Sequence, residues 1–376
     1  MAQKKLQVGI VGLGRMGRRH ATNFLERTFR ADVVAAWAFD ERESEWGYQQ
    51  LQPHGATIYT DYDKFLQHAG LEAVVIATVA GAHADQALKA IEQDKHVLCE
   101  KPLSISAEIV SYWSQNMHAM TVFGLQRGKS SPQSQSVVDA AAKKPHLKVL
   151  CAFSRRFDDS YRKAWAKIRA SAIGKPTVFR SQTCDMLNPT GFFLPYVRAS
   201  GGVFLDLNVH DIDLSLWFLG EDLVMKSVSA SGVCAVHPEL AELGDVDNGV
   251  AIVEFWGGKL VQLFTSRIMA AGQHDMSEII GTKGKLVVNG HPAESLVEMH
   301  EVGGIRRQLP ADYYGRFEHA FVTEANEFTA SCLDDTDLPF ALNGAVKAVE
   351  IATALRESLT TGQKIHFDES GRRIGT

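Results

Sequence analysis

Short apolar runs alternate with helical patterns through the first part of the chain. The runs of strand length cover residues 6–11, 32–39, 73–77 and 96–99. The helical patterns between them cover residues 16–25 and 81–93. Near-continuous apolar strands are typical of a parallel sheet that is buried on both faces. We therefore expect residues 1–150 to form a doubly wound α/β domain, which binds its ligand beyond the carboxyl ends of its strands.

The period of the apolar positions changes in the second part of the chain. Apolar runs between glycine-containing turns predict strands at residues 226–233, 249–255, 260–266, 276–280 and 285–288. Amphipathic patterns predict helices at residues 317–328 and 343–360. Residues 151–376 are therefore expected to form an α+β domain with a large, mainly antiparallel open sheet. We expect the helix at 343–360 to return to the first domain.

Three glycines occupy the turn between the first strand and the first helix. Gly12, Gly14 and Gly17 form the pattern GxGxxG around Arg15 and Met16. The first glycine permits a tight turn, the second lets backbone N–H groups approach a pyrophosphate, and the third allows close helix–strand packing. The N-terminus of the helix adds a favourable dipole for phosphates. The first domain is therefore predicted to be a Rossmann domain that binds a dinucleotide with these five residues.

Polar side chains stand at the carboxyl ends of two further predicted strands. Thr78 follows one strand, and Glu100 and Lys101 follow another. Because a doubly wound sheet binds its ligand at this edge, we expect Thr78, His83 and Glu100 to contact the cofactor. His83 can equally cap the helix that it begins. Lys101 precedes Pro102 at the predicted crevice of the sheet, and this position favours a catalytic role for Lys101 over a solvent-exposed one.

A carboxylate and an imidazole stand four residues apart in the second half. Asp206 and His210 project from the same side if they lie on one helix. Histidine suits general acid–base work because its ordinary pKa is near physiological pH. We therefore predict that Asp206, His210 and Lys101 are catalytic. The alternative is a structural histidine on a buried helix face.

The composition narrows the class of protein. The 376 residues are 45% hydrophobic and 22% charged, with a net charge of −5, so no basic surface for nucleic acid or an anionic membrane is expected. No apolar stretch approaches the roughly 18 residues that span a bilayer. The five cysteines are widely spaced without a CxxC pair, so neither a metal site nor a disulfide framework is predicted. With no signal peptide at the amino terminus, we expect a cytoplasmic protein.

Three segments together resemble the Gfo/Idh/MocA family of nicotinamide-dependent sugar and polyol oxidoreductases. They are GLGRMG at 12–17, EKP at 100–102 and DLNVH at 206–210. The second half is most similar to the inositol dehydrogenase branch. The resemblance implies hydride transfer between nicotinamide and a secondary alcohol or carbonyl of a cyclitol, sugar or polyol. It also implies a homodimer or homotetramer that assembles through the open face of the sheet.

The same resemblance suggests two substrate-binding residues besides the catalytic ones. The segment CAFSRRFDDSY at 151–161 is similar to inositol dehydrogenases, which implies that Arg155 lines the polyol site. The alternative, which we favour for Arg156, is pairing with Asp158 and Asp159 at a solvated helix start. Asn208 replaces the glycine that many relatives have, and it is expected to face the sugar pocket or cap the turn.

The other histidine and the neighbouring aspartates have weaker assignments. His274 follows a predicted strand and is assigned to the substrate, although a hydrogen-bonded loop histidine is the stronger interpretation. Asp211 and Asp213 follow the catalytic pair, and helix-terminal charge or buried ion pairing explains them better than catalysis. Asp213 is the stronger structural candidate of the two.

The sequence leaves the choice between NAD and NADP open. NAD-binding folds place an acidic residue about 20 residues beyond the glycines, where it binds the ribose 2′-hydroxyl. Matching the chain to inositol dehydrogenases puts Ala38 there, and alanine cannot repel a 2′-phosphate. Arg15 and Arg42 are near enough in sequence to supply a cation, whereas Asp40 reaches the ribose if the strand ends late.

Residues 110–133 do not fit the family pattern. One helix and a short loop should lead to the next strand, but these 24 residues are extra. One hypothesis is a retained intron in the gene, whose length would be a multiple of three nucleotides and would therefore keep the reading frame. A tolerated surface insertion explains the extra residues at least as well.

Other functions of the same fold stay open. A sugar or diol carbonyl reductase uses the same residues in the reverse direction, and an NAD-dependent glycosidase uses the hydride step transiently. Some relatives are dinucleotide-binding sensors or co-regulators without turnover. Lys101 together with His210 argues against a sensor, which needs no proton relay.

Overall fold

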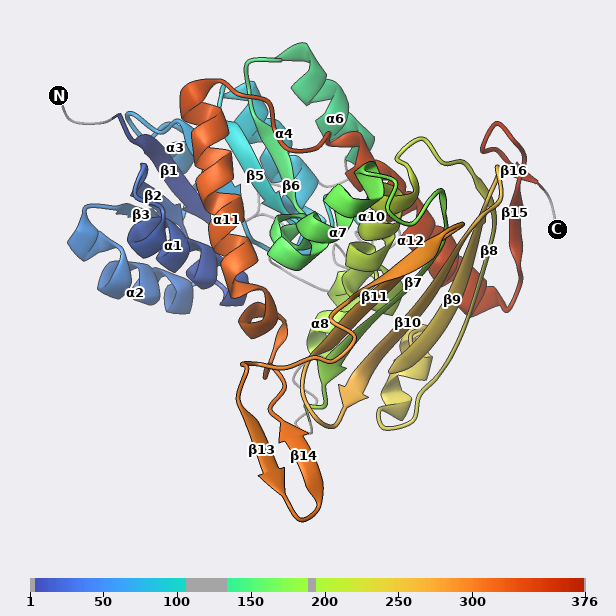
Figure 1. Cartoon of the computed structure of the whole chain (residues 1–376). Coiled ribbons are helices and arrows are strands. Elements are labelled where there is room, and N and C mark those ends of the chain that lie inside the picture. Colours follow the sequence, from blue (N-terminus) through green and yellow to red (C-terminus); the bar gives the residue numbers. More distant parts are fainter. Residues whose placement is uncertain (1–3, 106–133, 189–193, 375–376) are drawn as a thin grey trace. The chain divides into compact units, whose positions relative to one another are not determined.

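The computed structural model describes residues 4–105, 134–188 and 194–374 (Figure 1). The predicted insertion at 110–133 therefore lies outside the described residues. The chain divides into two compact units. The first comprises Met1–Ser154 and Phe321–Val349, and the second comprises Arg155–Ala320 and Glu350–Thr376.

The first unit is built around a six-stranded parallel sheet in the order β3-β2-β1-β4-β5-β6. The strands are β1 Leu6–Val11, β2 Ala31–Trp37, β3 Thr57–Tyr59, β4 Ala73–Ile76, β5 His96–Glu100 and β6 Val149–Ala152. Strands β1 and β4 are almost fully buried, as their continuous apolar runs predict. The strand order reverses between β1 and β4, which is where such sheets bind nucleotides. The predicted Rossmann architecture is confirmed.

Helices follow most strands of this sheet. They are α1 Arg15–Arg27, α2 Glu41–Gln50, α3 Tyr62–Leu66, α4 His83–Glu92 and α6 Ser134–Lys143, with short 3₁₀ turns at Gln52–His54 and Ala80–Ala82. The division between the two units falls within α11 (Tyr313–Asp334) and α12 (Asn343–Thr361). Helix α11 is kinked at Phe317, whose φ of −115° and ψ of 15° depart from helical values.

The second unit contains an eight-stranded sheet in the order β12-β11-β7-β10-β9-β8-β15-β16. The strands are β7 Pro176–Met186, β8 Met225–Val233, β9 Asn248–Phe255, β10 Lys259–Met269, β11 His274–Gly281, β12 Gly284–Val288, β15 Ile365–Phe367 and β16 Arg373–Ile374. All neighbouring pairs are antiparallel except β7 and β10, which are parallel. The predicted large, mainly antiparallel sheet is therefore confirmed, although β7, an interior strand between β11 and β10, was not among the predicted strands.

Helices and a separate hairpin complete the second unit. The helices are α7 Asp159–Arg169, α8 Leu194–Ser200, α9 Val203–Asp206 and α10 Val209–Leu219, with 3₁₀ turns at Ser154–Phe157 and Pro238–Leu243. Helix α10 is buried on almost every side and packs on β7 and β10. Strands β13 (Glu298–Glu301) and β14 (Gly304–Arg307) form the hairpin. Among the described residues, no helix combines the length and the apolar character that crossing a bilayer requires.

A buried acid in α11 makes the stability of the first unit depend on pH. Glu324 is fully buried, and neither carboxylate oxygen has a hydrogen-bond partner among the described residues. Burial, with a smaller contribution from the charge of Glu100, raises the pKa of Glu324 well above its ordinary value. The folded protein therefore holds a proton that the unfolded chain releases above the ordinary pKa of glutamate, so Glu324 lowers stability as the pH rises.

Replacing Glu324 with glutamine should remove this cost. We expect Glu324→Gln to be more stable than the wild type near neutral pH. Its advantage should grow by about 1.4 kcal/mol per pH unit above the ordinary pKa of glutamate, until the raised pKa of the folded state is reached. Urea unfolding across this range measures the difference. Glu327→Gln, one turn away at a partly exposed position, is the matched control. An advantage of Glu324→Gln that does not change with pH would contradict the prediction.

Candidate active site

The glycine turn of the first unit has the geometry that a pyrophosphate needs. Gly12 has a φ of +87°, which favours glycine. A Cβ atom on Gly17 would lie 1.8 Å from the carbonyl oxygen of Gly12, so only glycine allows α1 to start this close to β1. A Cβ atom on Gly14 would meet one described atom within 4 Å, Oε1 of Glu43. The turn is therefore tight on its inner side and open at Gly14.

The start of α1 suits an anionic ligand. The first turn of the helix carries no acidic residue of its own, and the dipole of the helix favours an anion at this end. Arg15 is exposed and Met16 is half-buried beside the open glycine. The residues present thus fit the phosphates of a dinucleotide, which the backbone N–H groups of the turn would hold.

Thr78 and His83 support the turn from β4. The methyl group of Thr78 fills the space beside Gly12, and its hydroxyl donates to Gln86 at 2.6 Å. The buried His83 ring has Nδ1 2.8 Å from the Pro102 carbonyl and Nε2 3.2 Å from that of Thr78. Burial lowers the pKa of His83, outweighing the effect of both carbonyls, so the ring is neutral. Its position ties the loops after β4 and β5 together, and its contact with a cofactor stays a prediction.

Glu100 is held below the surface at the end of β5. Its Oε1 lies 2.8 Å from Nε2 of the buried His20, and its Oε2 accepts from the backbone N–H of Lys101 at 3.2 Å. Burial alone would raise the pKa of Glu100, but the hydrogen bond and charge of His20, with the charge of Lys101, lower it overall. The carboxylate is therefore ionised and fixed. Lys101, the next residue along the chain, is half-buried.

The end of β2 differs from the usual arrangement of NAD-binding folds. Strand β2 ends at Trp37, and Ala38 is fully buried. The carboxylate of the exposed Asp40 accepts from the backbone N–H of Glu43 and caps α2. Glu43, which no sequence motif marks, reaches back to the glycine turn through its Oε2, which accepts from Leu13 N–H at 2.9 Å.

Asp206 and His210 do not share one helix, so that prediction is wrong. Helix α9 ends at Asp206 and α10 begins at Val209, because the ψ of −8° at Asn208 departs from the helical value. Asp206 is buried and accepts from Nη2 of Arg267 at 3.0 Å and from the hydroxyl of Tyr196 at 3.2 Å.

His210 is positioned by an aromatic partner. Its ring stacks on Tyr313 with centroids 4.9 Å apart, and Nδ1 lies 3.2 Å from the Tyr313 hydroxyl. His210 is 4% exposed, and the contact with Tyr313 fixes the orientation of its ring. Tyr313 is more than 100 residues away in sequence, and no motif marks it.

Arg155 lies in a buried ionic cluster under α10. Its guanidinium donates to Asp211 at 3.0 Å, Asp275 at 2.9 Å and the Thr183 hydroxyl at 2.8 Å. The fully buried Asn208 donates to the other oxygen of Asp211 at 2.7 Å. The cluster fixes α10 to β7 and β11. The predicted contacts of Arg155 and Asn208 with a polyol stay predictions, and the structure gives both residues a role in this cluster.

Arg156 has a structural role, but with other partners than expected. It makes a bidentate ion pair with Asp213, through Nε at 2.8 Å and Nη2 at 2.7 Å, and Nη1 donates to Glu221 at 2.8 Å. The expected pairing with Asp158 at a solvated helix start is wrong, since Arg156 is buried and Asp158 pairs with Arg316 at 2.9 Å while capping α7. The structural interpretation of Asp213 is confirmed.

His274 begins β11 instead of lying in a loop. Its ring is half-buried, and Nε2 has no hydrogen-bond partner in the part of the chain that the structure describes. Burial lowers the pKa of His274. The expected hydrogen bond is therefore absent from the described residues, and a substrate contact stays a prediction.

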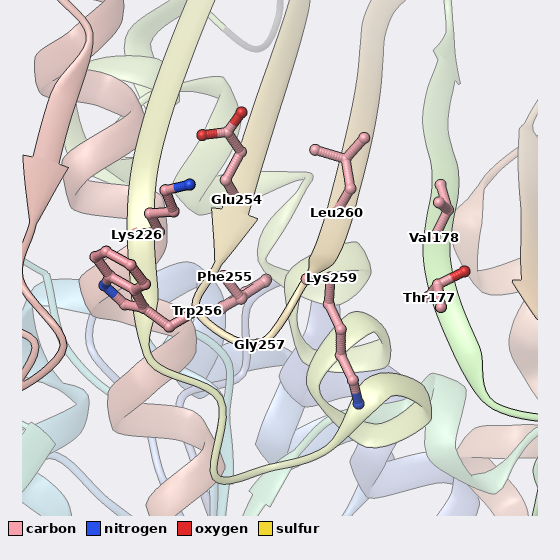
Figure 2. Close-up of a pocket in the computed structure, with 10 residues that line it drawn as sticks. Thr177, Val178, Lys226, Glu254, Phe255, Trp256, Gly257, Lys259 and Leu260 are labelled. Atoms are coloured by element: carbon pink, nitrogen blue, oxygen red, sulfur yellow. The ribbon is translucent and has the colours of Figure 1, made fainter.

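A hollow of about 300 Å³ lies at the turn between β9 and β10 (Figure 2). Lys226 lies 5.3 Å from the centre of the Trp256 ring, and Lys259 donates to the carbonyl of Leu219. The polar groups here serve the fold, and none of the predicted catalytic residues lines the hollow. Among the described residues, no cluster of His, Cys, Asp and Glu could hold a metal ion.

Two family profiles match the chain. The profile described as an oxidoreductase family with an NAD-binding Rossmann fold matches residues 6–119. The profile described as the GFO/IDH/MocA C-terminal domain matches residues 161–287.

The chain is similar to inositol dehydrogenases over nearly its full length. The scyllo-inositol 2-dehydrogenase (NAD(+)) of Bacillus subtilis is 28% identical over 370 residues, 97% of each chain. The crystal structure of scyllo-inositol dehydrogenase from Lactobacillus casei with bound NAD(H) and scyllo-inositol is 30% identical, with a TM-score of 0.85, and the match covers 96% of this chain and 99% of that one. Myo-inositol 2-dehydrogenase from Lactobacillus plantarum is 26% identical, with a TM-score of 0.84 and coverage of 97% and 100%.

Proposed function

The chain belongs to the GFO/IDH/MocA oxidoreductase family, and from this membership we propose that it oxidises a secondary hydroxyl of an inositol with NAD. The observation that carries the proposal is the match over 96% of the chain to a scyllo-inositol dehydrogenase that was solved with NAD(H) and scyllo-inositol. When bound, the nicotinamide supplies the acceptor for the hydride that leaves the alcohol carbon.

We assign the proton transfer to His210. With its proton on Nδ1, the ring donates to the Tyr313 hydroxyl oxygen 3.2 Å away, and Nε2 keeps a lone pair. That lone pair can take the hydroxyl proton of the substrate as the hydride leaves. In this proposal Asp206 orients His210 and Lys101. Arg267 and Tyr196 hold the carboxylate of Asp206 in place.

Lys101 has a complementary role in the proposal. Its ammonium hydrogen-bonds the same substrate oxygen and stabilises the negative charge that develops there. Glu100 is fixed by His20 and by the backbone N–H of Lys101, so it positions the segment that carries the lysine.

The finer parts of the proposal concern binding and assembly. Arg155, Asn208 and His274 are proposed to bind the polyol, and Thr78 and His83 to contact the cofactor. We also propose a cytoplasmic homodimer or homotetramer that assembles through the sheet of the second unit. Support for that face comes from β9, in which buried and more exposed residues alternate as in a sheet covered on one side.

Turnover with a panel of substrates tests the proposed function. Myo-inositol, scyllo-inositol, several aldoses and an open-chain polyol are each incubated with NAD, and the reduced nucleotide is followed by absorbance. We expect net reduction of NAD with at least one inositol and slower reduction with the open-chain polyol, whose hydroxyls are not held in a ring geometry.

Each other outcome contradicts the proposal in a different way. Oxidation of NADH by a carbonyl compound without detectable reverse reaction would favour a reductase. Cleavage of a glycoside without net NADH would favour a glycosidase. NADH binding without turnover on any substrate would favour a sensor.

A further inference from the structure

The first unit lacks an acidic residue at the end of β2, but an acidic residue of α2 contacts the glycine turn. Ala38 leaves the usual position without a carboxylate, and it is fully buried. Glu43 lies in the first turn of α2, five residues later. Its Oε2 accepts from Leu13 N–H at 2.9 Å and from Phe39 N–H at 3.0 Å. These donors come from the glycine turn and from the residue after Ala38, so the carboxylate bridges the ends of β1 and β2.

The two oxygens of Glu43 have different surroundings. Both backbone hydrogen bonds go to Oε2, and no described residue donates to Oε1. Oε1 is also the one described atom that a Cβ on Gly14 would meet within 4 Å, at 3.3 Å. One oxygen is thus anchored, while the other faces the open side of the glycine turn, where the residues fit a dinucleotide.

Helix capping alone does not explain this position. In a capping box the N3 glutamate accepts from the backbone N–H of the N-cap residue. Asp40 is the N-cap and Glu43 the N3 residue, and Asp40 accepts from Glu43 N–H at 2.8 Å as in that motif. Glu43 does not return the bond to Asp40 but accepts from Leu13, 30 residues earlier in the chain.

The cations that would favour NADP are differently placed. Nε of Arg18 donates to the Leu13 carbonyl at 2.8 Å, and its guanidinium lies 5.2 Å from the centre of the Trp46 ring. Arg15 and Arg42 are exposed. Leu13 thus holds both the Arg18 guanidinium and the Glu43 carboxylate, but of these two groups only the carboxylate has an atom within 4 Å of a Cβ on Gly14.

We propose that Glu43 selects NAD over NADP by binding the adenosine ribose, an inference that rests on the proposed function. A carboxylate accepts hydrogen bonds from the ribose hydroxyls of NAD, which is the role of the acid at the end of β2 in other NAD-binding folds. The same charge repels the 2′-phosphate of NADP. Glu43 is thus a specificity-determining residue, and the missing acid at Ala38 does not make the site accept NADP.

Nucleotide binding without substrate tests this role. NADH and NADPH are titrated separately into the full-length protein, and binding is followed by calorimetry. Glu43→Gln keeps an oxygen that can accept from Leu13 and Phe39 N–H but removes the charge. We expect it to weaken NADH binding about tenfold and to tighten NADPH binding about tenfold. Glu41→Gln, an exposed glutamate in the same helical turn, is the matched control and should leave both affinities unchanged.

The outcomes separate this inference from the proposed function. Wild-type protein that binds neither nucleotide would contradict the proposed function itself. Wild-type protein that prefers NADH, with the same preference in Glu43→Gln, would overturn the role of Glu43 alone. Equal weakening of both nucleotides would overturn it too, since Glu43 would then only shape the turn. Loss of the preference in Asp40→Asn instead would assign the ribose to Asp40.

Discussion

Replacing His210 with glutamine is expected to lower kcat for inositol oxidation about 1,000-fold. A positioned general base contributes about 10²- to 10⁴-fold to such rates, and glutamine cannot take a proton. Glutamine fits the space beside Tyr313, so the aromatic support of the site should survive. The glycine turn lies in the other unit of the chain, so the affinity for NADH should stay the same. Steady-state kinetics and NADH titration measure the two quantities.

A histidine outside the site is the control for this prediction. His366 is exposed on β15 of the same unit, and His366→Gln should keep wild-type turnover. If His210→Gln kept more than about a tenth of wild-type kcat, His210 would not be the base. If it lost NADH binding as well, the effect would be on folding and not on proton transfer.

Removing the carboxylate of Asp213 is expected to destabilise the second unit by about 3–5 kcal/mol. Arg156 and Asp213 form a bidentate pair with side-chain exposures of 1% and 2%, so Asp213→Ala leaves a buried guanidinium without its main counter-charge. The loss comes from this uncompensated charge more than from the hydrogen bonds themselves. Chemical unfolding measures it as a lower urea midpoint.

The same arginine provides an internal comparison. Glu221 also pairs with Arg156, but its side chain is 42% exposed. Because water screens that pair, Glu221→Ala should cost only about 0–1 kcal/mol. Equal losses in Asp213→Ala and Glu221→Ala would show that burial does not control the energy of these pairs.

The architecture was predictable wherever burial leaves a simple pattern. Strands β1 and β4 are buried on both faces, so they appear in the sequence as continuous apolar runs. The glycines were predictable because their backbone positions exclude a side chain, as the 1.8 Å contact at Gly17 shows. Both signals are local in sequence.

Strand β7 was missed because its buried side carries hydroxyl groups. Ser181 and Thr183 are buried there and donate to Asp211 on α10. An alternation of apolar and polar residues therefore does not mark this strand, although it lies in the interior of the sheet between β11 and β10. A strand whose buried side chains are polar can be recognised only when the charged partners of those side chains are known.

Two supporting residues of the site, His20 and Glu43, were missed for a related reason. His20 contacts Glu100 across 80 positions, just as Tyr313 contacts His210 across 103 positions. Glu43 stands where a helix-capping residue is expected, so nothing local distinguishes it. The chemistry-bearing residues form short motifs, whereas the residues that hold them come from distant elements.

The transfer of deuterium from substrate to nucleotide tests the central claim most directly. Scyllo-inositol and myo-inositol deuterated at the ring carbons are incubated with the wild-type protein and NAD, and the reduced nucleotide is analysed by mass spectrometry. The account predicts that NADH carries one deuterium with at least one inositol, because the hydride moves directly from carbon to nicotinamide. Absence of reduced nucleotide with both inositols, or NADH without deuterium, would contradict it.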